Sequence, residues 1–181
     1  MKDYPNDGIP YDAVPYDLPL IPLRGIYMFP HMVIHFDIGR QKSLESLEEA
    51  MLRNSEVILC SQKDYKVEQP TKKDLWPMGV LASIKQTLKL PNGSTRVLVE
   101  GVDRVSLEKL NLRTRYYAAQ GNIYEQTEVL EESKQMEAAT RLVLSDMREY
   151  LEFNPGMGQE MMFGLSDIDD PGRLCDVIAS Y

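Results

Sequence analysis

His31 and His35 are the residues whose types and spacing most directly suggest chemistry, since they lie four positions apart and Asp37 follows two positions later. Imidazole and carboxylate groups bind metal ions, and a metal site usually takes a third ligand from Cys, Asp or Glu. Asp37 shares the strand parity of the histidines but lies too near them in sequence to close a tetrahedron easily. We therefore expect no metal site and interpret both histidines as structural residues at the edge of a strand.

The other conspicuous polar cluster is the segment Asp167–Asp170, which contains three carboxylates. It lacks the ligand spacing and the glycine of an EF-hand calcium loop. Pro171 follows directly, and acidic residues before a proline are typical of the first turn of a helix. We interpret the cluster as a helix cap and not as a calcium site.

Motifs that would identify an enzyme are absent from the sequence. No G-x-x-x-x-G-K-[ST] or G-x-G-x-x-G segment is present to hold nucleotide phosphates, and no G-x-S-x-G segment is present to carry a nucleophilic serine. We therefore expect no catalytic residue and no cofactor-binding residue in this chain.

Composition and charge exclude further classes of function. The net charge is −8, and residues 118–181 hold 4 Lys/Arg against 13 Asp/Glu, so the acidity belongs to the last third of the chain. This acidity argues against a nucleic-acid module, and Lys72, Lys73, Arg113 and Arg115 are too sparse to follow a phosphate backbone. No signal peptide or membrane span is evident, which predicts a cytoplasmic protein. We expect Cys60 and Cys175 to be buried free thiols.

The first segment that could position a binding surface is Leu18–Gly39, an apolar stretch that three prolines interrupt. Proline fixes φ and lacks a backbone N–H, so this stretch predicts two short strands, with the prolines at strand edges, and not a helix or a central strand. The predicted strands are Leu18–Leu23 and Val33–Asp37. The intervening loop, Gly25–His31, would keep Tyr27, Met28 and Phe29 near the surface.

The next hundred residues predict further strands around one helix. Asn92-Gly93 lies between two alternating runs and predicts a hairpin, and a change of apolar parity next to Gly101 predicts a β-bulge that helps to close a small barrel. We expect Trp76 to anchor a polar connection to the core, and Leu88 to share the core face of Val80. The expected elements are a helix at Gln41–Asn54 and strands at Val57–Ser61, Gly79–Leu90, Thr95–Leu107 and Tyr116–Tyr124.

The composition changes near residue 125, after which the apolar period is helical. Helices are predicted at Thr127–Phe153, at Gln159–Leu165 and after Asp170, and the last one stops at Tyr181 in mid-pattern, as if cut from a longer chain. The expected organisation is an extended or disordered arm at 1–17, a β-rich lobe at 18–125 and a helical lobe at 126–181.

Two groups of apolar residues are candidates for binding a polypeptide. The first lies in and beside the loop, and the second lies in a short helix whose methionines could adapt to varied apolar partners. The alternative for the second group is packing into the core of the acidic half. The candidates are Tyr27, Met28, Phe29 and Met32, and then Met161, Met162 and Phe163.

Several motifs resemble the N-terminal domain of the bacterial-type ATP-dependent protease Lon, in the right order along nearly all of residues 18–181. They are Leu20-Ile21-Pro22-Leu23-Arg24, Phe29-Pro30, Gly39-Arg40, Leu88–Gly93 (LKLPNG), Val97–Arg104 (VLVEGVDR), Asp169–Leu174 (DDPGRL) and Asp176–Ser180 (DVIAS). The resemblance implies an α+β fold: a PUA-like β-barrel lobe of about six strands with one helix, and then an α-helical bundle lobe.

The resemblance also implies a non-catalytic fragment that recognises substrates and assists assembly. In the family, a homohexamer unfolds misfolded, damaged and regulatory proteins with an AAA+ module that uses ATP and Mg, and cleaves them with a Ser-Lys dyad. Those downstream modules are absent here, so the implied partners are unfolded polypeptides, the downstream ATPase and protease domains, and further copies of the chain. Two alternatives stay open: a stand-alone adaptor or ligand-binding module, and an RNA-binding lobe, which the acidic balance opposes.

Overall fold

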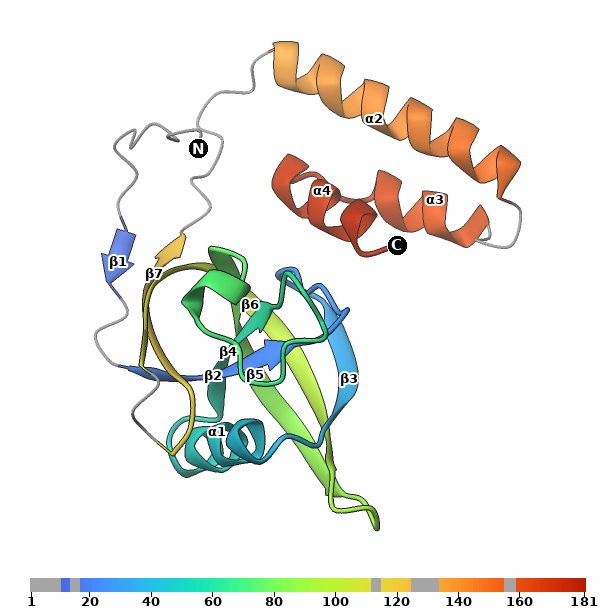
Figure 1. Ribbon diagram of the computed structural model, residues 1–181. Helices are drawn as coiled ribbons and strands as arrows, with labels where there is room; N and C mark the ends of the chain where they lie inside the picture. Colours follow the sequence, from blue (N-terminus) through green and yellow to red (C-terminus); the bar gives the residue numbers. More distant parts are fainter. Residues whose placement is uncertain (1–10, 14–16, 112–114, 125–133, 155–158) are drawn as a thin grey trace. The chain divides into compact units, whose positions relative to one another are not determined.

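The computed structural model describes residues 11–13, 17–111, 115–124, 134–154 and 159–181, with only the backbone considered at 11–13, 159–161 and 163. The chain forms two compact units, Met1–Glu125 (unit 1) and Gln126–Tyr181 (unit 2). Unit 1 contains the strands and unit 2 contains three helices (Figure 1). Most of the predicted arm and the start of the helix predicted at Thr127 lie outside the described residues.

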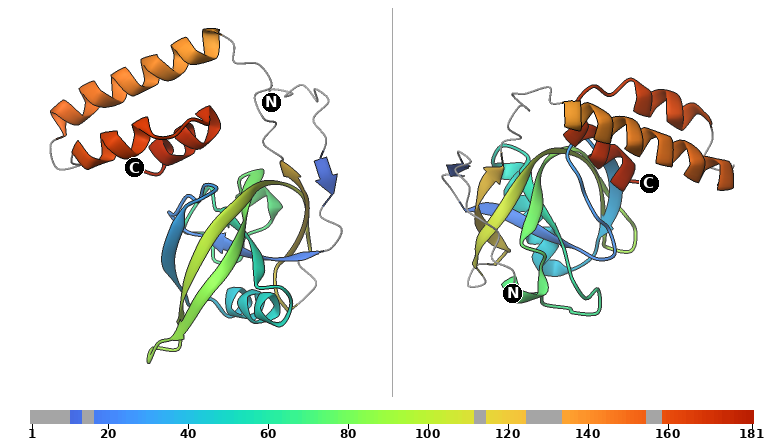
Figure 2. Two further views of the ribbon diagram at one scale, coloured as in Figure 1. Left: turned by 180° about the vertical axis from the view of Figure 1, so that it is seen from behind. Right: turned by 90° about the horizontal axis from the view of Figure 1, so that it is seen from above.

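Unit 1 is built on a sheet of seven strands in the order β1-β7-β2-β4-β5-β6-β3, with β7 also paired to β6. Five strands therefore close into a ring, and β1 and β3 lie outside it (Figure 2). We expected about six strands; the additional one is β1, within the predicted arm. The elements are β1 (Tyr11–Ala13), β2 (Leu18–Leu23), β3 (Val33–Ile38), α1 (Gln41–Leu52), β4 (Glu56–Ser61), the 3-10 turn η1 (Lys72–Asp74), β5 (Met78–Lys89), β6 (Thr95–Asn111) and β7 (Ala118–Tyr124).

The prolines of β2 are accommodated inside the ring, where we had expected them at a sheet edge. Leu18 and Pro19 pair with β7, whereas Leu20–Leu23 pair with β4. Each half of β2 therefore has a single paired neighbour, and a missing proline N–H leaves few hydrogen bonds unmade.

The predicted turn at Asn92-Gly93 and the predicted β-bulge next to Gly101 are both confirmed. Gly93 has φ +84°, its N–H donates to Leu90 O at 3.1 Å, and β5 and β6 pair on either side of the turn. Val102 is the extra residue of a β-bulge, because Leu81 pairs with Asp103 and Ala82 pairs with Gly101. Beyond this bulge β6 pairs with β7, which closes the ring as predicted.

A second bulge makes one prediction wrong. Lys85 is the extra residue of β5, since Ile84 pairs with Val99 and Gln86 with Leu98. One extra residue exchanges the two faces of a strand. Leu88 is therefore 56% exposed, although alternation from Val80 placed it in the core.

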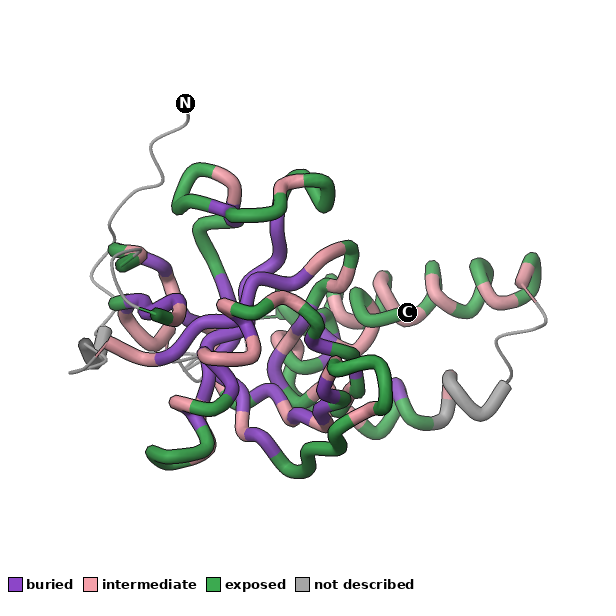
Figure 3. The backbone as a smooth tube through the Cα atoms, turned by 60° about the horizontal axis from the view of Figure 1, so that its bottom comes forward, coloured by how far each residue is buried: buried purple, intermediate pink, exposed green. Residues whose placement is uncertain are grey.

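The core of unit 1 lies on both faces of β4, which is buried from Val57 to Ser61. Val57 and Leu59 join a cluster that includes Leu47 of α1, and Ile58 and Cys60 join a second cluster. Figure 3 shows the buried residues gathered toward the middle of the tube and the exposed residues in the loops around them. The buried thiol of Cys60 agrees with the prediction.

We had expected Trp76 to anchor the connection between β4 and β5, and this prediction is wrong. It is 46% exposed, whereas Leu75 beside it is 1% exposed and packs in the second cluster. The isolated bridge between Gln62 and Leu75 holds this pair of segments together. The smaller aliphatic residue is therefore the anchor.

Unit 2 consists of α2 (Lys134–Phe153), α3 (Gln159–Ser166) and α4 (Pro171–Ala179). Its buried centre is Leu165 and Leu174, and partly buried side chains such as Met147 pack around them. Cys175 is exposed, which corrects the expected burial of its thiol. Among the described residues, no helix is long and apolar enough to cross a membrane.

Candidate functional site

The loop between β2 and β3 is held by its backbone. Gly25 and His31 have positive φ angles of 66° and 64°, which glycine adopts readily and histidine rarely. The His31 N–H donates to Gly101 O at 2.9 Å, and the Gly101 N–H donates to Met32 O at 2.9 Å. The end of the loop is therefore fixed against β6 beside the Val102 bulge.

Gly101 lets the loop approach closely. A Cβ atom at this position would lie 2.4 Å from the carbonyl oxygen of Phe29, which is closer than van der Waals contact allows. The same glycine therefore serves both the bulge and the seating of the loop.

The side chains of the first candidate group differ in exposure. Tyr27 is 59% exposed, and Phe29 and Met32 are half-buried. Met28 is only 7% exposed and belongs to the core cluster, so its predicted surface position is wrong. The prolines and glycine that predicted the loop did not indicate which side chain turns inward.

Val33 is an exposed apolar residue beside the loop that the sequence did not single out. It begins β3, is 59% exposed and pairs with Glu100. Among the described strands, β3 is paired with β6 alone and lies at an edge of the sheet. Edge strands offer unpaired backbone groups to an extended chain.

The second candidate group lies in α3. Met162 is partly buried and packs against the centre of unit 2, which favours the packing alternative for this residue. The side chains of Met161 and Phe163 lie outside the described residues.

Two of the carboxylates that first suggested chemistry, Asp37 and Asp170, have structural partners, and His31 and His35 are exposed. Arg96 binds Asp37 through two nitrogens, at 2.7 and 3.0 Å, and this hydrogen bonding holds the pKa of Asp37 below its usual value. Asp170 caps α4, accepting from the Arg173 N–H at 2.6 Å as predicted. Within the described part of the chain, no three His, Cys, Asp or Glu residues are grouped to hold a metal ion.

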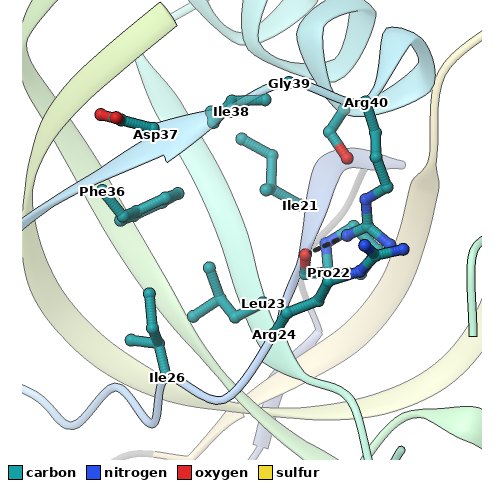
Figure 4. A pocket seen from close by; sticks show the side chains of 11 residues that line it. Ile21, Pro22, Leu23, Arg24, Ile26, Phe36, Asp37, Ile38, Gly39 and Arg40 are labelled. Carbon is teal, nitrogen blue, oxygen red and sulfur yellow. Dashed lines mark hydrogen bonds between the residues drawn. The ribbon is translucent and has the colours of Figure 1, made fainter. Parts of the chain in front are cut away.

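The structure adds a cavity that sequence reasoning missed. It has a volume of about 330 Å³ and lies between β2, the end of β3 and the start of α1. Figure 4 shows its apolar walls and, at one end, the side chains of Arg24 and Arg40. The apolar wall residues include Ile21, Leu23, Ile26, Phe36 and Ile38.

The two arginines are fixed mainly by neutral oxygen atoms. Arg40 donates to Gln62 Oε1 at 2.6 Å and also to Pro22 O. Arg24 donates to Val67 O at 3.2 Å and contacts the Glu68 carboxylate at 2.9 Å. That hydrogen bond from Arg24 lowers the pKa of Glu68. A sequence signal did exist, because each arginine directly follows an apolar strand or its glycine.

Comparison with known proteins gives consistent matches. The family profile of the ATP-dependent protease La (LON) substrate-binding domain matches residues 17–181. The Lon protease of Halothermothrix orenii is 40% identical over 165 residues, which cover 91% of this chain and 21% of that protein. Lon protease 1 of Bacillus subtilis is 35% identical over 164 residues, with 91% and 21% covered. The chain thus spans about a fifth of the length of these curated relatives.

Solved structures show the same fold. The N-terminal domain of Mycobacterium avium complex Lon protease matches with a TM-score of 0.69 at 18% identity, covering 92% of this chain and 82% of that chain. The Lon N-terminal domain protein from Xanthomonas campestris matches with a TM-score of 0.52 at 15% identity, covering 92% and 98%.

Proposed function

The chain belongs to the family of LON substrate-binding domains, and from this premise we propose that it is the non-catalytic substrate-recognition and assembly region of an ATP-dependent serine protease. Its substrates would be misfolded, damaged and regulatory proteins in the cytoplasm. ATP, Mg and the Ser-Lys dyad would belong to further modules, which would assemble as a homohexamer. The PUA-like and helical-bundle descriptions of the two units remain predictions.

The observation that carries this proposal is the edge of the sheet at β3. Strand β3 has one hydrogen-bonded neighbour among the strands that the structure describes. Tyr27 and Val33, each 59% exposed, lie in and beside the loop that leads into β3. An unfolded polypeptide offers unpaired backbone groups and apolar side chains. Such a chain can add to an exposed strand by main-chain hydrogen bonds and place its side chains against apolar neighbours.

The proposal is tested with the double variant Tyr27→Ser, Val33→Ser of the 181-residue chain. The matched control is Leu52→Ser, because Leu52 is 83% exposed at the end of α1 and belongs neither to β3 nor to the loop before it. The measurement is fluorescence anisotropy of a labelled, permanently unfolded protein such as reduced and carboxymethylated α-lactalbumin. We expect at least fivefold weaker binding for the double variant and unchanged binding for the control.

Both variants remove exposed side chains, so circular dichroism should show unchanged folding. Equal affinity of the double variant and the parent chain would overturn the assignment of this surface.

A further inference from the structure

The cavity beside α1 combines an apolar interior with an excess of positive charge. Arg24 and Arg40 lie at the same end of it, and the charge of Arg24 acts on Arg40 (Figure 4). Glu68 pairs with Arg24, and its side chain is 75% exposed. Within the described residues Arg40 forms no salt bridge. It donates hydrogen bonds to the side-chain amide oxygen of Gln62 and to the backbone carbonyl oxygens of Pro22 and Glu68. One guanidinium charge at the cavity is therefore not offset.

The remaining acidic residue at the cavity does not supply the missing charge. Asp37 lines the cavity, but both of its carboxylate oxygens are bound by Arg96. Burial lowers the pKa of Arg40, and the neighbouring Arg24 lowers it further. A guanidinium remains charged under such conditions, so an anion would relieve the repulsion between the two arginines.

Two buried polar atoms at this cavity lack partners. Ser43 is 2% exposed, lines the cavity, and its Oγ atom has no hydrogen-bond partner. The Nε atom of Arg24 is likewise buried without a partner. Buried polar atoms are nearly always satisfied in folded proteins, and an exception calls for a missing partner. Ser43 lies in the first turn of α1, where no side chain caps the helix and the helix dipole favours negative charge.

We propose that this cavity binds a carboxylate attached to a small apolar group. The carboxylate would accept hydrogen bonds from Arg24 Nε, from Arg40 and from Ser43 Oγ, and the apolar group would pack against Ile21, Leu23 and Phe36. The volume of about 330 Å³ lies at the lower end of the range of small-ligand pockets. It is large enough for a leucine-sized group together with its carboxylate. A free organic acid has this chemistry, and so does the C-terminus of a polypeptide ending in an apolar residue; the second source rests on the proposed function.

Isothermal titration calorimetry on the 181-residue chain tests the proposal. The probes are N-acetyl-leucine and its uncharged amide, and a decapeptide ending in leucine with a free or an amidated C-terminus. We expect at least tenfold weaker binding of each amide than of its acid. A peptide acid that binds at least tenfold tighter than N-acetyl-leucine supports the polypeptide source, and equal affinity supports the free acid.

Variants at two positions locate the binding. Arg40→Gln should weaken the binding of both acids at least tenfold. Arg40→Lys should give an affinity between those of the parent chain and Arg40→Gln. Because Arg40 also donates to Pro22 O, Ser43→Ala provides a test that preserves these contacts. It removes only an unpartnered hydroxyl and should weaken the acids three- to fivefold without loss of stability, while Ser106→Ala, which lies outside the cavity, should have no effect.

The proposal is overturned if neither acid binds up to 10 mM, if the amides bind as well as the acids, or if Ser43→Ala leaves the affinity unchanged. Its failure is separable from that of the proposed function. Tyr27→Ser, Val33→Ser is expected to weaken binding of the unfolded protein and to leave N-acetyl-leucine unaffected.

Discussion

The central strand β4 of unit 1 buries side chains on both faces, whereas the helices of unit 2 bury few side chains. Strand β4 has five consecutive buried residues, from Val57 to Ser61, but α2 has none among its 20 residues. Leu142 and Phe153 of α2 remain 62% and 78% exposed. Since hydrophobic burial is the main favourable contribution to folding, we expect unit 1 to be the more stable unit.

The largest expected contrast between the units is in thiol reactivity. Burial raises the pKa of Cys60 in unit 1 to about 12, and Cys175 in unit 2 is exposed. At pH 8 an aromatic disulfide reagent should label the exposed Cys175 quickly, and it should label Cys60 about a thousandfold more slowly than in the unfolded chain, because only the thiolate reacts. The raised pKa stabilises unit 1 below about pH 8.5, and that contribution is lost as the pH rises through about 12.

The absorbance of the aromatic thiolate that the reagent releases measures the labelling rates of Cys60 and Cys175. Cys175→Ser should abolish the rapid phase, and two rapid thiols in the folded parent chain would contradict the burial of Cys60.

The next effect concerns the core of unit 1. Leu59→Ala should lower the free energy of unfolding of unit 1 by about 3 kcal/mol, because it leaves a cavity beside a side chain that is 1% exposed. Urea unfolding followed by Trp76 fluorescence reports unit 1, which holds the single tryptophan of the chain. Circular dichroism at 222 nm reports mainly unit 2, since α2 alone has 20 residues against 12 in α1.

The dichroism transition of the Leu59→Ala variant should retain its midpoint. A shift of both transitions by the same amount would show that the two units unfold together, and the contrast between them would then fail.

A smaller effect is expected at the start of α4. Asp170→Ala removes the side chain that accepts from the Arg173 N–H at 2.6 Å, and losing such a cap costs about 1 kcal/mol. The urea midpoint of the dichroism transition should decrease, and that of the Trp76 fluorescence transition should be unchanged. Asp170→Asn is the control, because asparagine caps nearly as well.

The smallest effect is on the acid sensitivity of unit 1. The hydrogen bond from Arg96 lowers the pKa of Asp37, so the pair stabilises the fold above the unfolded-state pKa of about 4. This contribution is lost as the pH falls through the lower folded-state pKa. Asp37→Asn should make the Trp76 transition slightly less dependent on pH in acid, and the exposed Glu149→Gln in unit 2 should not. Equal acid profiles would mean that the pair contributes nothing measurable.

Local signals predicted the elements of both units well. The bounds of β2, the Asn92-Gly93 turn and the Asp170 cap all depend on backbone preferences of a few residues, which a sequence displays directly. The bulge at Val102 was predictable because Gly101 accompanies the change of parity.

Features that depend on distant partners were not predictable. The Lys85 bulge carries no glycine, so the exposure of Leu88 follows only from the pairing with β6. The choice of Leu75 over Trp76 as an anchor, and the inward turn of Met28, depend on the shape of the space left by other strands. The cavity brings Arg24, at the end of β2, to Arg40 and Ser43 at the start of α1. Each arginine directly follows an apolar strand or its glycine, but nothing in the sequence indicates that these two places meet.

The pairing of β7 has a consequence for how the protein is made. Strand β7 pairs with β1, β2 and β6, so the ring cannot close until residue 124 has left the ribosome. Strands β5 and β6 can form their hairpin earlier, and Leu20–Leu23 of β2 can pair with β4 about 38 residues away. Only Leu18 and Pro19 of β2 wait for a partner about a hundred residues away, and non-local pairing of this kind is slow. The nascent chain therefore leaves the start of β2 and the far end of β6 without their β7 partners until the synthesis of unit 1 is nearly complete.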